Sequence, residues 1–180
     1  MKVVAHSTLL LVDKVTKLNL PSLQQFEQSI TIMSPSRFNI QHVTEIKAPI
    51  DKVSDQLLDI AHWDWNLWTK LDALEAKTGV NGKLKACYEG DDVAWETFDF
   101  TFGPVDEYLL TWIGSVGPWG MLFHGYHTMK LEAIDAKTTR LTHTEVFAGL
   151  LPMLGLGLPY KKLDENYLKM NNAFKAHVEA

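Results

Sequence analysis

Residues 71–148 carry the pattern that most restricts what this chain can fold into. Short runs that read as strands lie near 71–79, 83–89, 93–102, 107–114, 121–133 and 138–148. Turn-forming residues separate these runs, among them Asn81-Gly82, Gly103-Pro104 and Gly117-Pro118. Connections this short join antiparallel strands, because a parallel pair needs a long crossover. The sequence therefore predicts an antiparallel meander.

Further elements flank the meander on both sides. The alternation over residues 38–47 predicts one more strand, and Pro49 then opens a helix that continues to about residue 60. Residues 61–70 hold three tryptophans in a second short helix or turn. After Pro159 a helix runs to residue 180, and its inner stripe has helical spacing. The members of that stripe are Leu163, Tyr167, Met170, Phe174 and Val178.

This order of elements predicts an α+β fold. A curved antiparallel sheet needs a cover on its concave face, and only the C-terminal helix is long enough to supply one. A sheet wrapped around a single helix leaves an internal gap, where an apolar cavity would form. We expect this domain to cover residues 37–180. Residues 1–36 form an N-terminal extension, in which Pro21-Ser22 and Gln25 indicate a short helix.

The composition narrows the set of partners. The formal net charge of -5 argues against a nucleic-acid partner. No apolar segment is long enough for stable membrane insertion, and the first residues lack an export signal. Cys87 is the only cysteine, which excludes an intrachain disulfide and is typical of a cytoplasmic protein. We expect a monomer or a homodimer.

No nucleotide-binding or hydrolase signature occurs in the sequence. It has no P-loop, no dinucleotide fingerprint after a strand, no HExxH and no GxSxG. No cofactor is therefore expected. Cys87 alternates with Lys85 and Glu89, which predicts that its thiol faces outward and argues against a nucleophilic role.

An ordered set of segments resembles the SRPBCC superfamily, which includes START-like, pollen-allergen-like and polyketide cyclase-like proteins. The segments are IKAPIDKV (46–53), Trp65-Asn66, LTWIG (110–114), FHGYHTMKLE (123–132), TTRLTHTEVFAGLL (138–151) and KMNNAFKAHVE (169–179). The resemblance implies a helix-grip fold and a small hydrophobic ligand. It does not fix an activity, because one fold hosts many functions. A carrier or sensor, a cyclase-like enzyme and an interaction module all stay open.

His127, His143 and Glu145 are the candidate catalytic residues. Strand alternation places His127 on the apolar face of one run, and His143 and Glu145 on the apolar face of the next. Adjacent antiparallel strands would bring these side chains together inside the sheet. A carboxylate beside an imidazole can act as a general acid–base pair. The same cluster can instead orient a ligand, or satisfy its own hydrogen bonds as part of the core.

A metal site of two histidines and one carboxylate is possible by ligand type, but no local metal motif supports it. The remaining candidates are apolar or aromatic residues expected to line the cavity, with Tyr167 and Asn171 able to hydrogen-bond a ligand. The segment from Gly149 to Pro159 is either a gate over the cavity or a buried connection. The predicted ligand-binding residues are Trp65, Phe98, Phe100, Trp112, Phe123, Met129, Tyr167, Met170, Asn171 and Phe174.

Overall fold

The computed structural model of the protein describes residues 38–88, 95–116 and 121–180. The extension predicted for residues 1–36, with its short helix, lies outside this part of the chain. The predicted turn at Gly117-Pro118 lies outside it as well.

A single 7-stranded antiparallel sheet forms the body of the molecule, in the order β1-β7-β6-β5-β4-β3-β2. Consecutive strands from β2 to β7 are neighbours, so the predicted meander is confirmed. Strand β1 lies beside β7 and forms one edge of the sheet. The strands are β1 (Ile40–Ile46), β2 (Thr69–Asp72), β3 (Asn81–Ala86), β4 (Glu96–Phe102), β5 (Leu109–Val116), β6 (Phe123–Asp135) and β7 (Thr138–Ala148).

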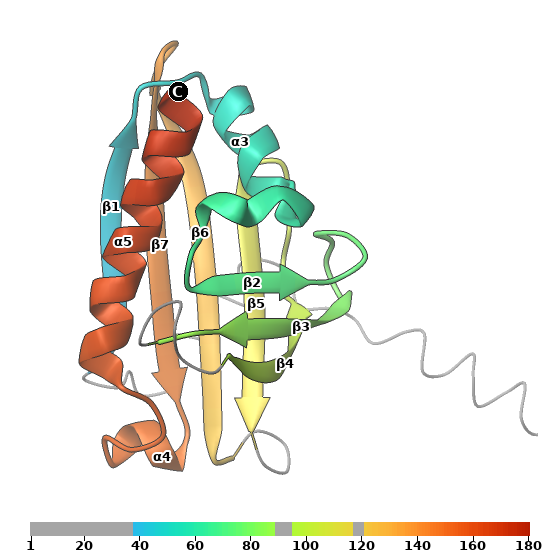
Figure 1. The fold of residues 1–180 in the computed structure, drawn as a ribbon, viewed down its shortest axis with the longest axis vertical. Helices are drawn as coiled ribbons and strands as arrows, with labels where there is room; N and C mark the ends of the chain where they lie inside the picture. Colours follow the sequence, from blue (N-terminus) through green and yellow to red (C-terminus); the bar gives the residue numbers. More distant parts are fainter. Residues whose placement is uncertain (1–37, 89–94, 117–120) are drawn as a thin grey trace, which may run out of the picture.

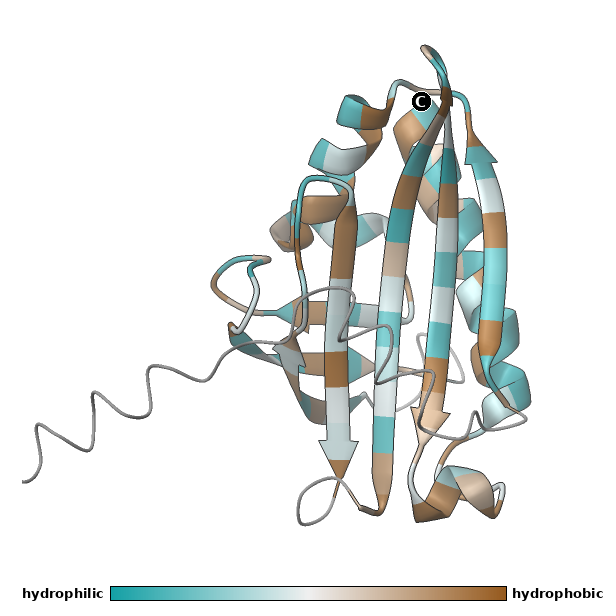
Figure 2. Ribbon diagram, turned by 180° about the vertical axis from the view of Figure 1, so that it is seen from behind, coloured by the Kyte–Doolittle hydropathy of each residue, from teal (hydrophilic) through white to brown (hydrophobic). Residues whose placement is uncertain are grey.

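The helices lie on one face of this sheet (Figure 1), and the view from behind shows the strands uncovered (Figure 2). The long C-terminal helix α5 runs beside β1 and β7. Helix α3 lies near the C-terminal end of α5, and α4 lies at the opposite end of the molecule. The helices are α3 (Ile50–Leu58), the 3-10 helix η1 (Ile60–Trp65), α4 (Leu150–Met153) and α5 (Tyr160–Glu179).

Helix α5 packs as its sequence pattern predicts. Its apolar stripe is buried against the concave face of the sheet, because removing those side chains from water is the main gain that holds the helix in place. Two asparagines, Asn166 and Asn171, are buried beside the stripe. The buried stripe consists of Leu163, Tyr167, Met170, Phe174 and Val178.

Two of the predicted local features are wrong. The strand expected at 71–79 is β2, which begins at Thr69 and ends at Asp72, because the following residues do not alternate and Leu74 is 94% exposed. Asn81-Gly82 is not a turn but the start of β3. A Cβ at Gly82 would come within 2.6 Å of the Phe100 ring, so glycine is needed there for Phe100 to pack.

The predicted outward position of Cys87 is also wrong, because its side chain is 0% exposed. Cys87 follows the last residue of β3, and its backbone N–H donates to the carbonyl of Trp68 at 2.8 Å. The alternation ends where the strand ends, and both Ala86 and Cys87 are buried. No helix among the described residues combines the length and the apolar character needed to cross a membrane.

Candidate functional site

A cavity of about 500 Å³ lies between the concave face of the sheet and α5. Strands β2 to β7 supply most of its wall, α5 supplies one side, and Leu151, Gly157 and Leu158 contribute from the chain around α4. Within the segment 149–159, Leu151 and Leu158 line the cavity while Leu154 and Leu156 are exposed, so it is not a fully buried connection, and its role as a gate stays a prediction. Of the predicted site residues, those that line the cavity are Phe98, Phe100, Trp112, Phe123, His127, Glu145, Tyr167 and Met170.

The other predicted residues lie outside the cavity wall. Phe174 packs against Trp65, with ring centroids 4.9 Å apart, in the core beside η1. Met129 is fully buried in the same core, and it pairs with Leu110 across β5 and β6. The helical and strand periodicities identify inward-facing positions, but they do not separate core from cavity wall. His143 and Asn171 also lie outside the cavity wall, where they extend a polar network.

The polar network begins at Glu145, which lies directly opposite His127 in the pairing of β6 and β7. His127 Nδ1 is 3.1 Å from Glu145 Oε2, and Tyr167 donates its hydroxyl hydrogen to the same oxygen. The indole of Trp112 stacks on the His127 imidazole, with centroids 3.6 Å apart and planes 13° apart. The predicted approach of His127 to Glu145 is thus present in the structure, with Tyr167 as an added partner.

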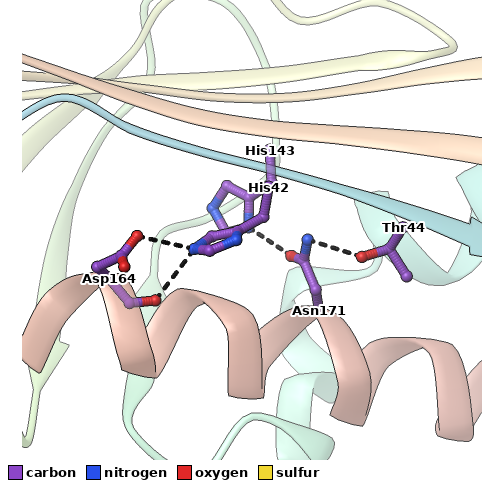
Figure 3. A network of polar contacts seen from close by, with 5 residues as sticks. All are labelled: His42, Thr44, His143, Asp164 and Asn171. Carbon is purple, nitrogen blue, oxygen red and sulfur yellow. Dashed lines mark hydrogen bonds and ion pairs between the residues drawn. The ribbon is translucent and has the colours of Figure 1, made fainter.

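From His127 the network continues away from the cavity toward α5 and β1. His127 Nε2 lies 2.6 Å from His143 Nε2, and His143 Nδ1 lies 2.6 Å from Asn171 Oδ1. Asn171 Nδ2 donates to Thr44 Oγ1 at 3.1 Å. Figure 3 shows this end of the network, where α5 meets the strands. We call these five residues the buried network: Glu145, His127, His143, Asn171 and Thr44.

The contacts determine which atoms carry protons. Because Asn171 donates to Thr44, its oxygen faces His143, and His143 Nδ1 must be the donor of that pair. A neutral His143 then offers only a lone pair at Nε2, so the hydrogen between the two imidazoles belongs to His127. The remaining nitrogen of neutral His127 is an acceptor, and Glu145 must supply the proton between them.

Burial of the charged forms gives the same protonation pattern. Burial raises the pKa of Glu145 to about 8, because a carboxylate in an apolar wall loses its hydration. Burial lowers the pKa of His127 well below its ordinary value, and it does the same for His143, where the nearby His127 adds to the effect. At neutral pH the network is therefore uncharged, with the carboxyl proton of Glu145 directed at His127.

A third histidine, His42 on β1, holds α5 to the sheet next to this network. His42 Nε2 lies 2.9 Å from Asp164 Oδ1 and 3.1 Å from the Asp164 carbonyl oxygen (Figure 3). His42 pairs with His143 across β1 and β7, so the contact of His42 with Asp164 lies beside the buried imidazole of His143. This contact fixes how far α5 is shifted along β1, and it therefore also fixes the position of Asn171.

Glycines make room for the carboxyl of Glu145. A Cβ on Gly125 would come within 2.6 Å of Glu145 Oε1, whereas a Cβ on Gly114, its partner across β5 and β6, would have only the Asp99 carbonyl oxygen 4.0 Å away. Both glycines line the cavity. Strand alternation could have identified them, since each lies two residues from an inward aromatic or histidine. Further cavity residues were not predicted as ligand contacts: Trp68, Thr69, Leu84, Ala86 and Leu163.

The described residues contain no group of three or more His, Cys, Asp or Glu side chains arranged to hold a metal ion. In the buried network the imidazole nitrogens already point at one another or at hydrogen-bonding partners. The arrangement can hold a proton next to the cavity and present a carboxyl oxygen to a ligand.

Comparisons with known proteins bear on the fold. The sequence matches no protein-family model and no curated protein. The structure resembles the Zhui aromatase/cyclase from Streptomyces sp. R1128, with a TM-score of 0.56, 20% identity and coverage of 78% of this chain and 93% of that one. It also resembles a norcoclaurine synthase point mutant from Thalictrum, with a TM-score of 0.57, 14% identity and coverage of 78% and 92%.

A third similar structure is the hypothetical protein jhp0584 from Helicobacter pylori. Its TM-score is 0.63 at 12% identity, over 83% of this chain and 92% of that one. Identities this low establish the architecture and leave the function open. The chain has the helix-grip fold, a curved antiparallel sheet around a C-terminal helix, as its sequence predicts.

Proposed function

We propose that the protein binds a small, mainly apolar molecule in the main cavity, with a polar atom of that molecule hydrogen-bonded to Glu145. The observation that carries the proposal is the cavity itself, whose largely aromatic and aliphatic wall includes the hydrogen-bonded cluster of Glu145, His127 and Tyr167. A volume of about 500 Å³ is typical of sites for small organic ligands. Ligand binding in an apolar cavity is also what the helix-grip resemblance implies.

The polar group defines how a ligand would lie. Glu145 Oε1 lies beside Gly125 on the cavity wall, where a ligand hydroxyl or N–H can donate to it. The flat rings of Phe98 and Phe100 offer apolar contact on the β4 side. A planar ligand with one hydroxyl or amine group fits this wall better than a flexible saturated chain, because ring stacking adds to burial of apolar area.

The test uses native mass spectrometry and the uncharged fluorescent probe N-phenyl-1-naphthylamine. We expect a molecule to co-purify with the protein, or the probe to bind the emptied protein with one-to-one stoichiometry. Gly114→Leu should weaken probe binding by about tenfold or more, because a Cβ at Gly114 has space and the added side chain enters the cavity. Lys130→Leu places the same side chain on an exposed position of β6 and is the matched control. A protein that carries no ligand and binds no apolar probe would contradict the proposal.

A second candidate function is acid–base catalysis on the bound molecule. The observation that favours it is a carboxyl on the cavity wall whose pKa is raised to about 8 and whose proton is shared with His127. With its proton on Oε1, the oxygen beside Gly125 on the cavity wall, instead of on Oε2, the carboxyl can donate to a ligand carbonyl oxygen at neutral pH and recover the proton afterwards. One similar structure is an aromatase/cyclase, which makes ring closure of a carbonyl-bearing chain the reaction to test.

The enzyme hypothesis is tested by incubating the protein with open-chain, carbonyl-bearing precursors and following products by liquid chromatography with mass detection. Wild-type protein should form cyclised products that Glu145→Gln does not form. The variant should still bind N-phenyl-1-naphthylamine, since the amide replaces the carboxyl without a change in volume. Equal product formation by both proteins would exclude Glu145 as the acid, and the carrier hypothesis would remain.

A further inference from the structure

A second, smaller pocket of about 220 Å³ lies on the other side of Trp68 from the main cavity. It is bounded by the connection from η1 to β2, by the end of β3 and by α5. Trp68, Tyr88 and Met170 line both spaces and form the partition between them. We call it the second pocket, and neither the fold nor the proposed function accounts for its polar lining.

Two side chains of this lining each carry a buried hydrogen-bond donor that has no partner. Asn66 is 1% exposed, and its Oδ1 accepts the backbone N–H of Trp68 at 3.4 Å, which leaves its Nδ2 unpaired. The indole Nε1 of Trp68, a residue that is 8% exposed, is also buried without a partner. Buried donors in native proteins are almost always paired, so these two require an acceptor from outside the described residues.

The charge of the lining has one sign. Lys162 and Lys169 lie seven residues apart on α5, which places them on the same face of the helix, and both line the second pocket. The lining contains no carboxylate, and neither lysine forms an ion pair within the described part of the chain. Asn166, between them, already donates its Nδ2 to the carbonyl of Tyr88 at 3.2 Å. The second pocket therefore offers cations and N–H donors, but no anion of its own.

We infer that the second pocket binds an oxyanion, a carboxylate or a phosphate. Asn66 Nδ2 and the Trp68 indole N–H are the buried donors, and Lys162 and Lys169 supply the opposite charge at the rim. Charge-assisted hydrogen bonds of this kind are among the stronger polar contacts in proteins. The oxyanion is either free in solution or the head of an amphipathic molecule whose apolar part contacts the partition residues. The inference does not depend on what occupies the main cavity.

The experiment follows the indole N–H resonance of Trp68 by two-dimensional nitrogen–proton NMR, with Trp68→Phe used to assign it. Inorganic phosphate and acetate test a free oxyanion. Dodecanoate and dodecyl phosphate test an amphipathic one, with 1-dodecanol as the uncharged control. We expect the resonance to shift with at least one oxyanion and not with 1-dodecanol. Saturation by phosphate or acetate identifies a free anion, whereas saturation only by the dodecyl compounds identifies an amphipathic ligand.

Matched variants connect the shift to the second pocket. Asn66→Asp keeps the acceptor oxygen but replaces the unpaired donor with a negative oxygen, so it should weaken oxyanion binding by about tenfold or more. Lys162→Ala/Lys169→Ala should do the same. Lys161→Ala/Lys130→Ala removes equal charge elsewhere on the surface and should leave binding unchanged. The inference is overturned if no oxyanion shifts the resonance, or if the two double variants weaken binding equally.

One further outcome would overturn it. The sequence after Tyr88 contains Glu89, Asp91 and Asp92, which lie outside the described residues. If oxyanion binding occurs only in the triple variant Glu89→Gln/Asp91→Asn/Asp92→Asn, the acceptor is a carboxylate of this chain and not a ligand. Binding to wild-type protein, with the variant pattern above, supports the second pocket as an oxyanion site.

Discussion

Two groups of buried polar side chains lie against α5, and they differ in whether the protein satisfies their hydrogen bonds. In the buried network each hydrogen bond from Glu145 to Thr44 joins donor and acceptor atoms that lie within 3.1 Å of each other. In the second group, which we call the unpaired group, Asn66 Nδ2, Trp68 Nε1 and Thr69 Oγ1 have none. The two groups are equally buried, so the difference is not one of exposure to water.

The comparison separates two roles for buried polarity. A paired network offsets the cost of burial and restricts the strands and helix that contribute to it to one arrangement. An unpaired donor carries the full free-energy cost of its burial. A ligand that supplies an acceptor removes this cost, and the free energy gained adds to the affinity for that ligand. The buried network thus holds α5 on β1 and β7 and sets the protonation of Glu145, while the unpaired group is the region prepared for a partner.

The largest expected effect comes from breaking the middle of the buried network. Asn171→Ala removes the acceptor of His143 and the donor to Thr44, leaving buried polar atoms unpaired. We expect the free energy of unfolding to fall by about 2–4 kcal/mol, measured by urea denaturation. Asn172→Ala, at an exposed position of the same helix, should change it by less than about 0.5 kcal/mol. Similar values for the two variants would show that the network adds nothing to stability.

The next effect tests how tightly the network is packed at its cavity end. Gly125→Ala places a Cβ within 2.6 Å of Glu145 Oε1, so the carboxyl must move away from His127 or Tyr167. We expect a loss of about 1–3 kcal/mol in the free energy of unfolding. Gly114→Ala, across the same strand pair, has space and should be neutral or stabilise by up to about 1 kcal/mol. If both variants match the wild type, the Glu145 carboxyl is not held in place.

The pH dependence of stability tests the protonation of the network. The pKa of Glu145 is about 8 in the folded protein and near 4.5 in the unfolded chain, so the folded protein holds the extra proton between these values. Its contribution is complete below pH 4.5 and is lost as the pH rises through 8. The two histidines act in the opposite sense, because their lowered pKa values reduce stability as the pH falls below about 6.5.

Between pH 6.5 and 8 the buried histidines add little, but His62, whose pKa is raised by its hydrogen bond to Asp59, adds a slope of the same sign as Glu145. We expect the free energy of unfolding to fall by about 1–2 kcal/mol across this window, since one proton contributes at most about 1.4 kcal/mol per pH unit. Glu145→Gln should remove the Glu145 share of this slope and leave the smaller share of His62. Glu132→Gln, an exposed carboxyl on β6, should keep the whole slope. A wild-type protein whose stability is constant over the window would contradict an uncharged Glu145 at neutral pH.

These two groups also mark how far the sequence could predict the site. The approach of His127 to Glu145 followed from alternation on two long runs joined by a short turn, because a two-residue period and one adjacency fix both face and partner. Asn171 was predicted beside the inner stripe of the last helix, but as a ligand contact. Its bonds to His143 and Thr44 depend on the height of α5 along β1, which the sequence pattern does not specify.

Nothing in the sequence indicated that the donors of the unpaired group lack partners. Asn66 and Trp68 belong to a short connection without periodicity, and its position depends on how η1, β2 and α5 pack together. Whether a buried donor has a partner is a property of that packing and not of residue type. For the same reason the pattern placed Cys87 on the wrong face, because alternation holds only while the strand continues.

The smallest expected effect distinguishes the two groups most directly, since it compares one substitution at two buried threonines. Thr139 donates its hydroxyl hydrogen to the Ala48 carbonyl at 2.8 Å, whereas Thr69 Oγ1 has no partner. Thr69→Val removes an unpaired hydroxyl and should raise the free energy of unfolding by about 0.5–1 kcal/mol, while Thr139→Val should lower it by about 1 kcal/mol. Because both substitutions replace a hydroxyl with a methyl group, the opposite signs, measured by urea denaturation, report hydrogen bonding and not volume. Destabilisation by Thr69→Val of the same size as by Thr139→Val would mean that Thr69 is paired in solution, and the distinction between the groups would not extend to it.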